Sequence, residues 1–318
     1  MDTMHAVRAH SRGGPERLTY ETAPRPRAAP DEVLVAVRAA SITADELTWD
    51  ATWTDSFDGT GADRTPIIPS HEVSGIAAAV GPGVTSVAVG DEVYGLIPFT
   101  RDGAAAEYVS VPADALAAKP AGLDHDRAAA VPLAALTAWQ ALVDHASVKA
   151  GQHVLIHGAA GGVGSFAVQI AAALGARVTA TAAARDRDFV TSLGAERVLD
   201  YAGARFEDQA GDVDVVLDLV GGRTQERSWA VLRPGGVLVS IVSPPDPERA
   251  AEHGARGTFF IVEPSHDELG SIARLIENGR LIPVVDHVVE LADTREAYET
   301  LRGEHQRGKV VIHVPAAP

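Results

Sequence analysis

A glycine-rich segment carries the clearest chemical signal in the sequence. The residues from His153 to Gly164 read HVLIHGAAGGVG, so an apolar run leads directly into a turn rich in glycine. Apolar residues then recur with the spacing of one helix face, and a second apolar run begins after Gly175. Strand, glycine-rich turn, helix and second strand is the order in which proteins bind the pyrophosphate of a dinucleotide. The segment therefore predicts a dinucleotide site.

Individual glycines have separate roles in such a site. Gly161 would let backbone amides at the start of the helix reach phosphate oxygens without an intervening Cβ, and Gly164 would let the helix pack closely on the strand. Ala159 stands where the strict pattern has its first glycine. Tight turns also need glycine, so a turn without a ligand is the alternative interpretation.

The end of the second predicted strand, Arg177–Thr181, distinguishes between cofactors. NAD sites usually carry Asp or Glu about 20 residues after the loop begins, where it binds the ribose 2′-hydroxyl. Here the strand is followed by Ala182–Ala184, with no acid before Arg185, and Arg187 lies two residues further on. Guanidinium groups can bind the 2′-phosphate of NADPH, whereas two solvated arginines at a helix start are the alternative. We therefore expect NADPH.

Apolar patterning divides the chain into two domains. Short strands separated by turn residues are predicted in the first third, at Met4–Ala9, Val33–Ala39, Glu72–Val80, Asp91–Ile97 and Ala106–Pro112. After a predicted helix at Leu133–His145, strands and helices alternate, which is typical of a parallel sheet with helices on both faces. We expect a β-rich catalytic domain over residues 1–122, a nucleotide-binding domain over 123–262, and a tail over 263–318 that returns to the first domain.

Composition and charge exclude several classes of protein. Lys and Arg number 27 against 43 Asp and Glu, a formal net charge of −16, so no basic surface is available for nucleic acid or an anionic membrane. The absence of cysteine excludes disulfides and cysteine-ligated zinc. No apolar run approaches the roughly 20 residues that cross a bilayer, and the N-terminus lacks the pattern of a secretory signal. We expect a cytoplasmic protein that binds a small-molecule substrate.

Beyond these patterns, the chain resembles the medium-chain dehydrogenase/reductase superfamily, and within it the zinc-independent, quinone oxidoreductase-like branch. The segments that carry the resemblance span nearly the whole sequence: Ala40–Thr43, Pro69–Gly75, Val89–Gly95, Leu133–Leu142, Gly158–Gly164, Leu199–Tyr201, Asp218–Gly222, Arg233–Gly236 and Gly308–Lys309. The resemblance implies an α/β fold, with a GroES-like β-barrel catalytic domain and a Rossmann domain whose parallel sheet is doubly wound. It also implies a homodimer.

The sequence departs from this superfamily at the catalytic position. Zinc alcohol dehydrogenases place Cys where Thr43 stands and pair it with the His of a motif matched here by His71 and Glu72. Catalytic zinc normally needs three good protein ligands, so we expect no metal. Quinone oxidoreductase-like members often have Asn at the position of Thr43. The absence of this Asn is a second departure, and it concerns the group that forms hydrogen bonds with the substrate.

The loop and the resemblance together predict the cofactor site. Members that prefer NADPH often place Ser, then Lys or Arg, after the second strand and Tyr at the end of the third. The matching residues here are Ala183, Arg185 and Tyr201, so the phosphate contact of the Ser is lost. The predicted cofactor-binding residues are Gly158, Ala160, Gly161, Gly162, Val163, Gly164, Ala183, Arg185, Tyr201, Val220, Val242, Phe260 and Val262.

The substrate side of the site needs hydrogen-bond donors. Hydride transfer to a conjugated carbonyl compound leaves negative charge on an oxygen, which a hydroxyl or imidazole would stabilise. The candidate catalytic residues are Thr43, His71 and Thr137. The predicted lining of the substrate pocket is Glu46, Trp49, Trp53 and Tyr94, with the Tyr94 hydroxyl as a further donor.

Structural alternatives stay open for these residues. His71 could be hydrogen-bonded within the barrel, and Thr137 could bond back to its own helical turn. Trp49 and Trp53 could anchor an acidic loop that ends at Asp63. The predicted function is an NADPH-dependent oxidoreductase that reduces a quinone, enone or related activated double bond or carbonyl by hydride transfer without a metal. The alternative is a non-catalytic NADPH-binding regulatory protein.

Overall fold

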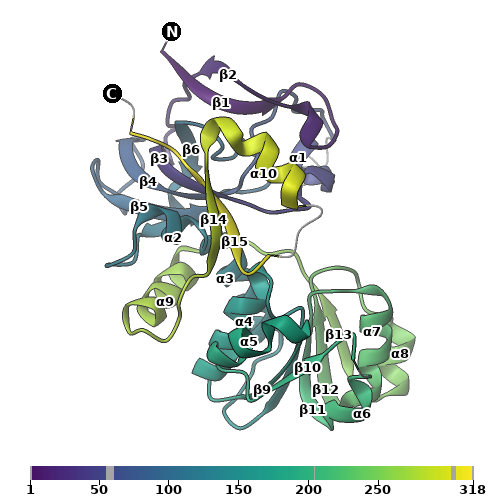
Figure 1. Cartoon of the computed structure of the whole chain (residues 1–318). Helices are drawn as coiled ribbons and strands as arrows, with labels where there is room; N and C mark the ends of the chain where they lie inside the picture. Colours follow the sequence, from purple (N-terminus) through teal and green to yellow (C-terminus); the bar gives the residue numbers. More distant parts are fainter. Residues whose placement is uncertain (1, 55–60, 204, 302–305, 317–318) are drawn as a thin grey trace. The chain divides into compact units, whose positions relative to one another are not determined.

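The chain forms two compact units (Figure 1). The computed structural model describes residues 2–54, 61–203, 205–301 and 306–316. The first unit comprises residues 1–133, 263–277 and 283–318, and the second comprises residues 134–262 and 278–282. Residues 263–277 and 283–318 therefore group with the first unit, whereas residues 278–282 group with the second. The predicted domain bounds, 1–122, 123–262 and 263–318, differ from these units and stay predictions.

Strands make up most of the first unit. β1 (Thr3–Ala9) and β2 (Leu18–Pro24) pair as an antiparallel hairpin. A larger sheet has the order β14-β15-β3-β4-β5-β7, and β6 pairs with β3 outside this path. Its strands are β3 (Glu32–Ile42), β4 (Glu72–Val80), β5 (Glu92–Leu96), β6 (Tyr108–Pro112), β7 (Leu116–Ala118), β14 (Val285–Glu290) and β15 (Lys309–His313).

Two of these strands, β2 and β7, are absent from the sequence prediction. β2 reads LTYETAP and exposes most of its side chains, so its apolar alternation is weak. β7 spans only Leu116–Ala118 and consists of leucine and alanine, which have no preference for strands. The apolar strand β3 was easier to predict, because its valines face the core of the unit.

The register of the sheet gathers polar residues at one end. Glu72, the first residue of β4, lies opposite Ser41, near the end of β3. On the other side of β3, β15 runs antiparallel to it and begins at Lys309. Thr43, which directly follows β3, therefore lies at the end of the sheet where β4 and β15 begin.

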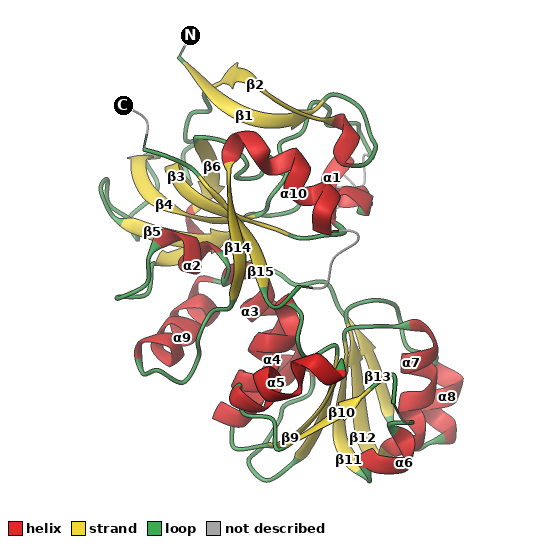
Figure 2. Ribbon diagram, viewed as in Figure 1, coloured by secondary structure: helices red, strands yellow, loops and turns green. Residues whose placement is uncertain are grey.

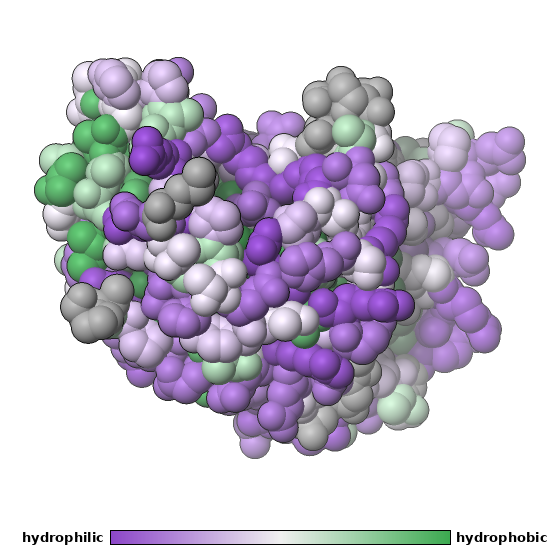
Figure 3. Space-filling model, turned by 90° about the horizontal axis from the view of Figure 1, so that it is seen from above, coloured by the Kyte–Doolittle hydropathy of each residue, from purple (hydrophilic) through white to green (hydrophobic). Residues whose placement is uncertain are grey.

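Short helices accompany the sheet of the first unit. They are α1 (Asp50–Trp53), α2 (His125–Ala129), α9 (His266–Glu277) and α10 (Thr294–Leu301). α9 buries Leu269, Ile272, Ala273 and Ile276 along one face, as its amphipathic sequence predicts. Within the described part of the chain, no helix is long and apolar enough to cross a membrane. Hydrophilic residues dominate the face shown in Figure 3.

The second unit is a parallel sheet with helices on both faces (Figure 2). Its strand order is β10-β9-β8-β11-β12-β13. The strands are β8 (His153–His157), β9 (Arg177–Ala182), β10 (Arg197–Asp200), β11 (Val213–Asp218), β12 (Leu232–Ser240) and β13 (Arg256–Phe259). Its helices include α4 (Gly162–Ala173), α5 (Arg187–Ser192), α6 (Glu207–Ala210), α7 (Gly222–Ser228) and α8 (Pro247–Glu252).

The order of this sheet reverses at β8. The chain passes from β8 to β9 on one side and later places β11 on the other side. Because the paired strands are parallel, their carboxyl ends lie along one edge, and such a reversal is where ligands bind in open α/β sheets. The predicted helix at Leu133–His145 is α3 (Pro132–Trp139), which continues as a π-helical turn over Gln140–His145.

Candidate active site

The glycine-rich loop connects β8 to α4 at the carboxyl edge of the parallel sheet. Gly158 has a φ of +73°, a conformation that L-residues with side chains rarely adopt. A Cβ on Gly164 would lie 2.2 Å from the carbonyl oxygen of Gly158, so this close packing needs glycine. A Cβ on Gly161 would meet nothing closer than 3.6 Å. The first-turn amides of α4 have no acceptors within the helix, so the loop fits a pyrophosphate.

Five other predicted cofactor residues lie at the same edge of the sheet. Arg185 is exposed in a 3-10 turn after β9, and Ala183 precedes that turn. Tyr201 follows β10 and is 64% exposed. Val220 and Val242 follow β11 and β12 and are 51% and 49% exposed. Apolar side chains exposed beside the loop can cover the faces of a bound dinucleotide.

The two arginines after β9 have different surroundings. Arg187 donates from Nη1 to the carbonyl oxygen of Val198 at 2.7 Å, so its guanidinium is held against β10. Arg185 lies in the turn itself, directly after the edge of the sheet. Arg185 stays the predicted contact with a 2′-phosphate, because it lies in the turn that directly follows β9.

Asp218 positions the turn that carries Val220, and sequence reasoning gave it no role. Its buried carboxylate ends β11 and accepts from the backbone amides of Val220 and Gly221 at 3.1 and 2.8 Å. It also accepts from Gln225 Nε2 at 3.1 Å and from Ser240 Oγ at 3.0 Å. An acid that ends a buried strand and precedes two glycines is a sequence signal that could have identified it.

Three predicted residues are buried in the second unit rather than exposed at this edge. Phe260 packs on His145 with ring centroids 4.3 Å apart, and Phe260 and Val262 are each 9% exposed. Thr137 lies within α3 and is 3% exposed. Their roles in binding or catalysis stay predictions.

In the first unit, Thr43 belongs to a cluster with Glu72 and Lys309. Lys309 Nζ donates to Thr43 Oγ1 at 3.2 Å and lies 2.5 Å from Glu72 Oε2. The other carboxylate oxygen, Oε1, accepts from the backbone N–H of Leu133 at 2.9 Å. The side chains of Lys309 and Glu72 are buried, whereas Thr43 is partly exposed. Sequence analysis named Thr43 as a donor but gave no role to Lys309.

His71 and Glu46 form a second buried group. His71 Nδ1 lies 3.2 Å from Glu46 Oε2, and Nε2 lies 3.3 Å from the carbonyl oxygen of Arg101. The same carboxylate oxygen accepts from the backbone N–H of Ser70 at 3.2 Å. The imidazole also packs edge-on against Phe99, with ring centroids 5.3 Å apart. Because both ring nitrogens face acceptors, this geometry favours a packing role for His71 over donation to a substrate.

The predicted pocket aromatics have internal partners. The Tyr94 hydroxyl is buried, donates to the carbonyl oxygen of Leu269 at 2.7 Å, and has its pKa raised by burial. Trp53 is buried and donates from Nε1 to the carbonyl oxygen of Leu47 at 3.0 Å. Neither residue has a polar atom to offer a substrate in this arrangement. Trp49 is half-buried against Phe99, and residues 55–60 of the predicted loop lie outside the described residues.

The donor set at Thr43 does not fit a catalytic zinc ion. A threonine hydroxyl is a poor zinc ligand, and the His71 nitrogens already face Glu46 and a backbone carbonyl. Glu72 is neutralised by Lys309, whose ammonium would repel a dication. Over the described residues, no group of three or more His, Cys, Asp or Glu side chains could hold a metal ion.

Two family models match the chain. The model of the alcohol dehydrogenase GroES-like domain matches residues 29–121, and a zinc-binding dehydrogenase model matches residues 193–312. The first match confirms the expected GroES-like domain. The parallel sheet, its helices on both faces and its glycine-rich loop confirm the expected Rossmann domain.

Individual relatives are similar over most of the chain. A probable zinc-binding oxidoreductase, mitochondrial, of Arthroderma benhamiae is 33% identical, covering 93% of this chain and 93% of that protein. The chloroplastic NADPH-dependent alkenal/one oxidoreductase of Arabidopsis thaliana is 33% identical, covering 78% of this chain and 64% of that protein. The solved structure of the quinone oxidoreductase from Coxiella burnetii has a TM-score of 0.90 at 30% identity, covering 99% of this chain and 100% of that one.

The geometry of the loop, the sheet topology and these similarities agree. Together they confirm the resemblance seen in the sequence. The chain belongs to the medium-chain dehydrogenase/reductase superfamily, whose members are oxidoreductases that depend on a nicotinamide dinucleotide.

Proposed function

We propose that the protein uses NADPH to reduce an activated carbon–carbon double bond, a quinone or a related carbonyl compound, and that no metal ion takes part. The observation that carries this proposal is the end of β9. No acid stands between the end of β9 and Arg185 to bind a ribose 2′-hydroxyl, and Arg185 is exposed in the turn that follows the strand. The names of the Arabidopsis and Coxiella relatives support the class of substrate.

The protein's own residues would bind the cofactor and stabilise charge on the substrate. The bound NADPH supplies the hydride. The amides at the start of α4 would hold the pyrophosphate, and the Arg185 guanidinium would hold the 2′-phosphate. Thr43, a partly exposed residue of the first unit, would donate from its hydroxyl to the oxygen that gains negative charge. His71 and Thr137 stay the other predicted donors.

A turnover assay tests the proposal. Purified protein treated with EDTA is mixed with NADPH and a panel of quinones, enones and ketones, and NADPH consumption is followed by absorbance. We expect at least one quinone or enone to be reduced, with NADH far less effective. Tight NADPH binding without turnover on any acceptor would contradict the proposal and favour a regulatory NADPH-binding protein.

We also propose that the protein is a cytoplasmic homodimer, as the sequence and its resemblance predict. Size-exclusion chromatography with light scattering measures the molar mass directly. A mass near twice 33.1 kDa supports the dimer, and a mass near 33.1 kDa contradicts it.

A further inference from the structure

Lys309 is the member of the Thr43 cluster whose presence needs an explanation. Its side chain is 6% exposed, and its partner Glu72 is fully buried. Removing two charges from water costs about as much as their attraction returns, and well-packed apolar residues often serve stability equally well. Packing therefore gives little reason for a lysine here, whereas buried charges often mark functional sites.

The contacts of Glu72 hold the ammonium in place. Glu72 Oε1 is occupied by the backbone N–H of Leu133 at 2.9 Å. Glu72 Oε2 has no aligned hydrogen-bond partner among the described residues and pairs with Lys309 by charge at 2.5 Å. One carboxylate oxygen is thus tied to the backbone, and the other fixes the position of the ammonium.

The direction of the next hydrogen bond is set by chemistry. An ammonium has donors and no acceptor, so Lys309 Nζ donates and Thr43 Oγ1 accepts, at 3.2 Å. The Thr43 hydroxyl proton is therefore available to another acceptor. Within the described residues, none accepts that proton. Thr43 as a residue is partly exposed, so we place its hydroxyl within reach of a ligand.

We propose that Lys309 is a positioning residue that acts through Thr43. This inference rests on the proposed function. The ammonium donates to one lone pair of Thr43 Oγ1, which leaves the hydroxyl proton for the substrate and makes it a stronger donor. Thr43 then stabilises the oxygen of the substrate that becomes negatively charged. Glu72 acts one step further back, because it holds Lys309.

For an enone, the reaction balances as follows. A hydride adds to the β-carbon and forms a C–H bond, the C=C π pair moves to form the enolate, and NADP⁺ remains. The Thr43 hydroxyl donates a hydrogen bond to the enolate oxygen. A proton from water then adds to the α-carbon, which yields the saturated ketone. Lys309 keeps its proton throughout and contributes positive charge.

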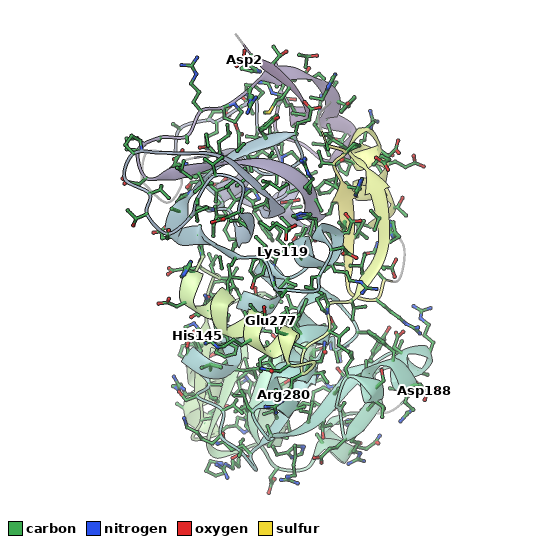
Figure 4. The ribbon with its side chains drawn as sticks, turned by 90° about the vertical axis from the view of Figure 1, so that its left-hand side faces the viewer. Asp2, Lys119, His145, Asp188, Glu277 and Arg280 are labelled. Atoms are coloured by element: carbon green, nitrogen blue, oxygen red, sulfur yellow. The ribbon has the colours of Figure 1, made fainter. Side chains whose placement is uncertain are left out.

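Variants of Lys309 and Thr43 test the inference against a matched lysine. Lys119, labelled in Figure 4, is also 6% exposed and pairs with a glutamate, Glu92, at 3.4 Å in the same unit. We compare Lys309→Met, Thr43→Val and their double variant with Lys119→Met. For each, the kcat, the KM for the acceptor, the Kd for NADPH and the Tm are measured on the best acceptor of the panel.

We expect Lys309→Met and Thr43→Val each to lower kcat by about 10- to 100-fold, the effect of losing a charge-assisted hydrogen bond. The double variant should lose little more than either single variant, because both changes remove the same donor. NADPH affinity should stay the same. Lys119→Met should keep the wild-type kcat whatever its Tm.

A rescue experiment adds a readout that a structural role would not move. Ethylammonium added to Lys309→Ala should restore part of kcat, and it should not activate Lys309→Ala/Thr43→Val. If Lys309→Met fails to fold, Lys309→Arg and the rescued Lys309→Ala decide the matter, because both keep a cation near Glu72. If the wild-type protein is active, either of two results overturns this inference alone. One is an unchanged kcat in the Lys309 variants. The other is a double variant whose loss equals the product of the two single losses, together with no rescue by ethylammonium. A wild-type protein without turnover overturns the proposed function and this inference together.

Discussion

Nε2 of His157 lies 3.0 Å from the hydroxyl oxygen of Ser228 in the interior of the second unit. The Ser228 hydroxyl donates to the carbonyl oxygen of Thr224 at 2.6 Å, so it accepts from His157. His157 Nδ1 then accepts from the Thr181 hydroxyl at 3.0 Å. The neutral imidazole therefore carries its proton on Nε2 and satisfies both hydroxyls, directly before the glycine-rich loop.

This arrangement predicts a loss of stability in acid. Burial lowers the pKa of His157 from 6.5 to about 4. Below pH 6.5 the unfolded chain binds a proton that the folded protein does not bind until about pH 4. The free energy of unfolding should therefore fall between these values, by on the order of 3 kcal/mol from this residue, and no further below them. Urea unfolding at stepped pH measures the change.

The control for this prediction is a second histidine. His157→Gln should flatten the acid limb of the stability curve, whereas the same change at His253, which is partly exposed and has no side-chain hydrogen bond or ion pair among the described residues, should leave the curve as in the wild type. An unchanged acid limb in His157→Gln would remove His157 from the explanation.

The glycine-rich loop predicts two different effects of adding one methyl group. In Gly164→Ala the new Cβ would meet the Gly158 oxygen at 2.2 Å, so α4 must shift and stability should fall by about 1–3 kcal/mol. In Gly161→Ala the nearest atom is 3.6 Å away, so the fold should persist while dinucleotide affinity drops. Thermal unfolding and NADPH titration of both variants check this pair, and Gly161→Ala with wild-type NADPH affinity would contradict it.

Arg185 and Arg187 give a matched test of cofactor choice. Arg185→Ala should weaken NADPH binding by about 1.5–3 kcal/mol and leave NADH binding nearly unchanged, because only NADPH carries the 2′-phosphate. Arg187→Ala removes the contact with the Val198 carbonyl, so it should lower the Tm without changing the ratio of the two affinities. Calorimetric titration with both cofactors measures each Kd. Equal losses for NADPH and NADH in Arg185→Ala would refute the assignment.

The environment of His71 predicts a structural effect. His71→Ala leaves the buried Glu46 carboxylate without its ring partner, and an unsatisfied buried group typically costs about 1–3 kcal/mol. The Tm should therefore fall clearly, while the folded fraction keeps its NADPH affinity and most of its turnover. Measurement of all three on one preparation separates this outcome from a catalytic role, for which turnover would fall and the Tm would hold.

The part of the site predicted from the sequence is the part built from neighbouring residues. The loop at Gly158–Gly164 and the helix after it are predicted from the local spacing of glycine and apolar residues. The preference for NADPH is likewise predicted from neighbouring residues, because no acid lies between β9 and Arg185. Lys309 is different, since its partner Thr43 lies 266 residues away in the sequence. Only the pairing of β15 with β3 brings the two together, and no local pattern encodes that pairing.

Burial is the other property that the sequence leaves open. Tyrosine and tryptophan occur both in pockets and in cores. In the folded chain the Tyr94 hydroxyl donates to the carbonyl oxygen of Leu269, and the Trp53 indole N–H donates to that of Leu47, so both polar groups are satisfied inside the protein. The residue types alone do not distinguish these two outcomes.

Transfer of a labelled hydride tests the central claim most directly. Metal-free protein is loaded with NADPH that carries deuterium at both positions of the transferring carbon and is mixed with the best enone or ketone of the panel, because deuterium on a quinone oxygen would exchange with water. The product is analysed by mass spectrometry and NMR. We predict one deuterium on the reduced carbon of the product, at a rate that added zinc does not raise. Product without deuterium, or turnover that appears only when zinc is added, would contradict a metal-free NADPH reductase.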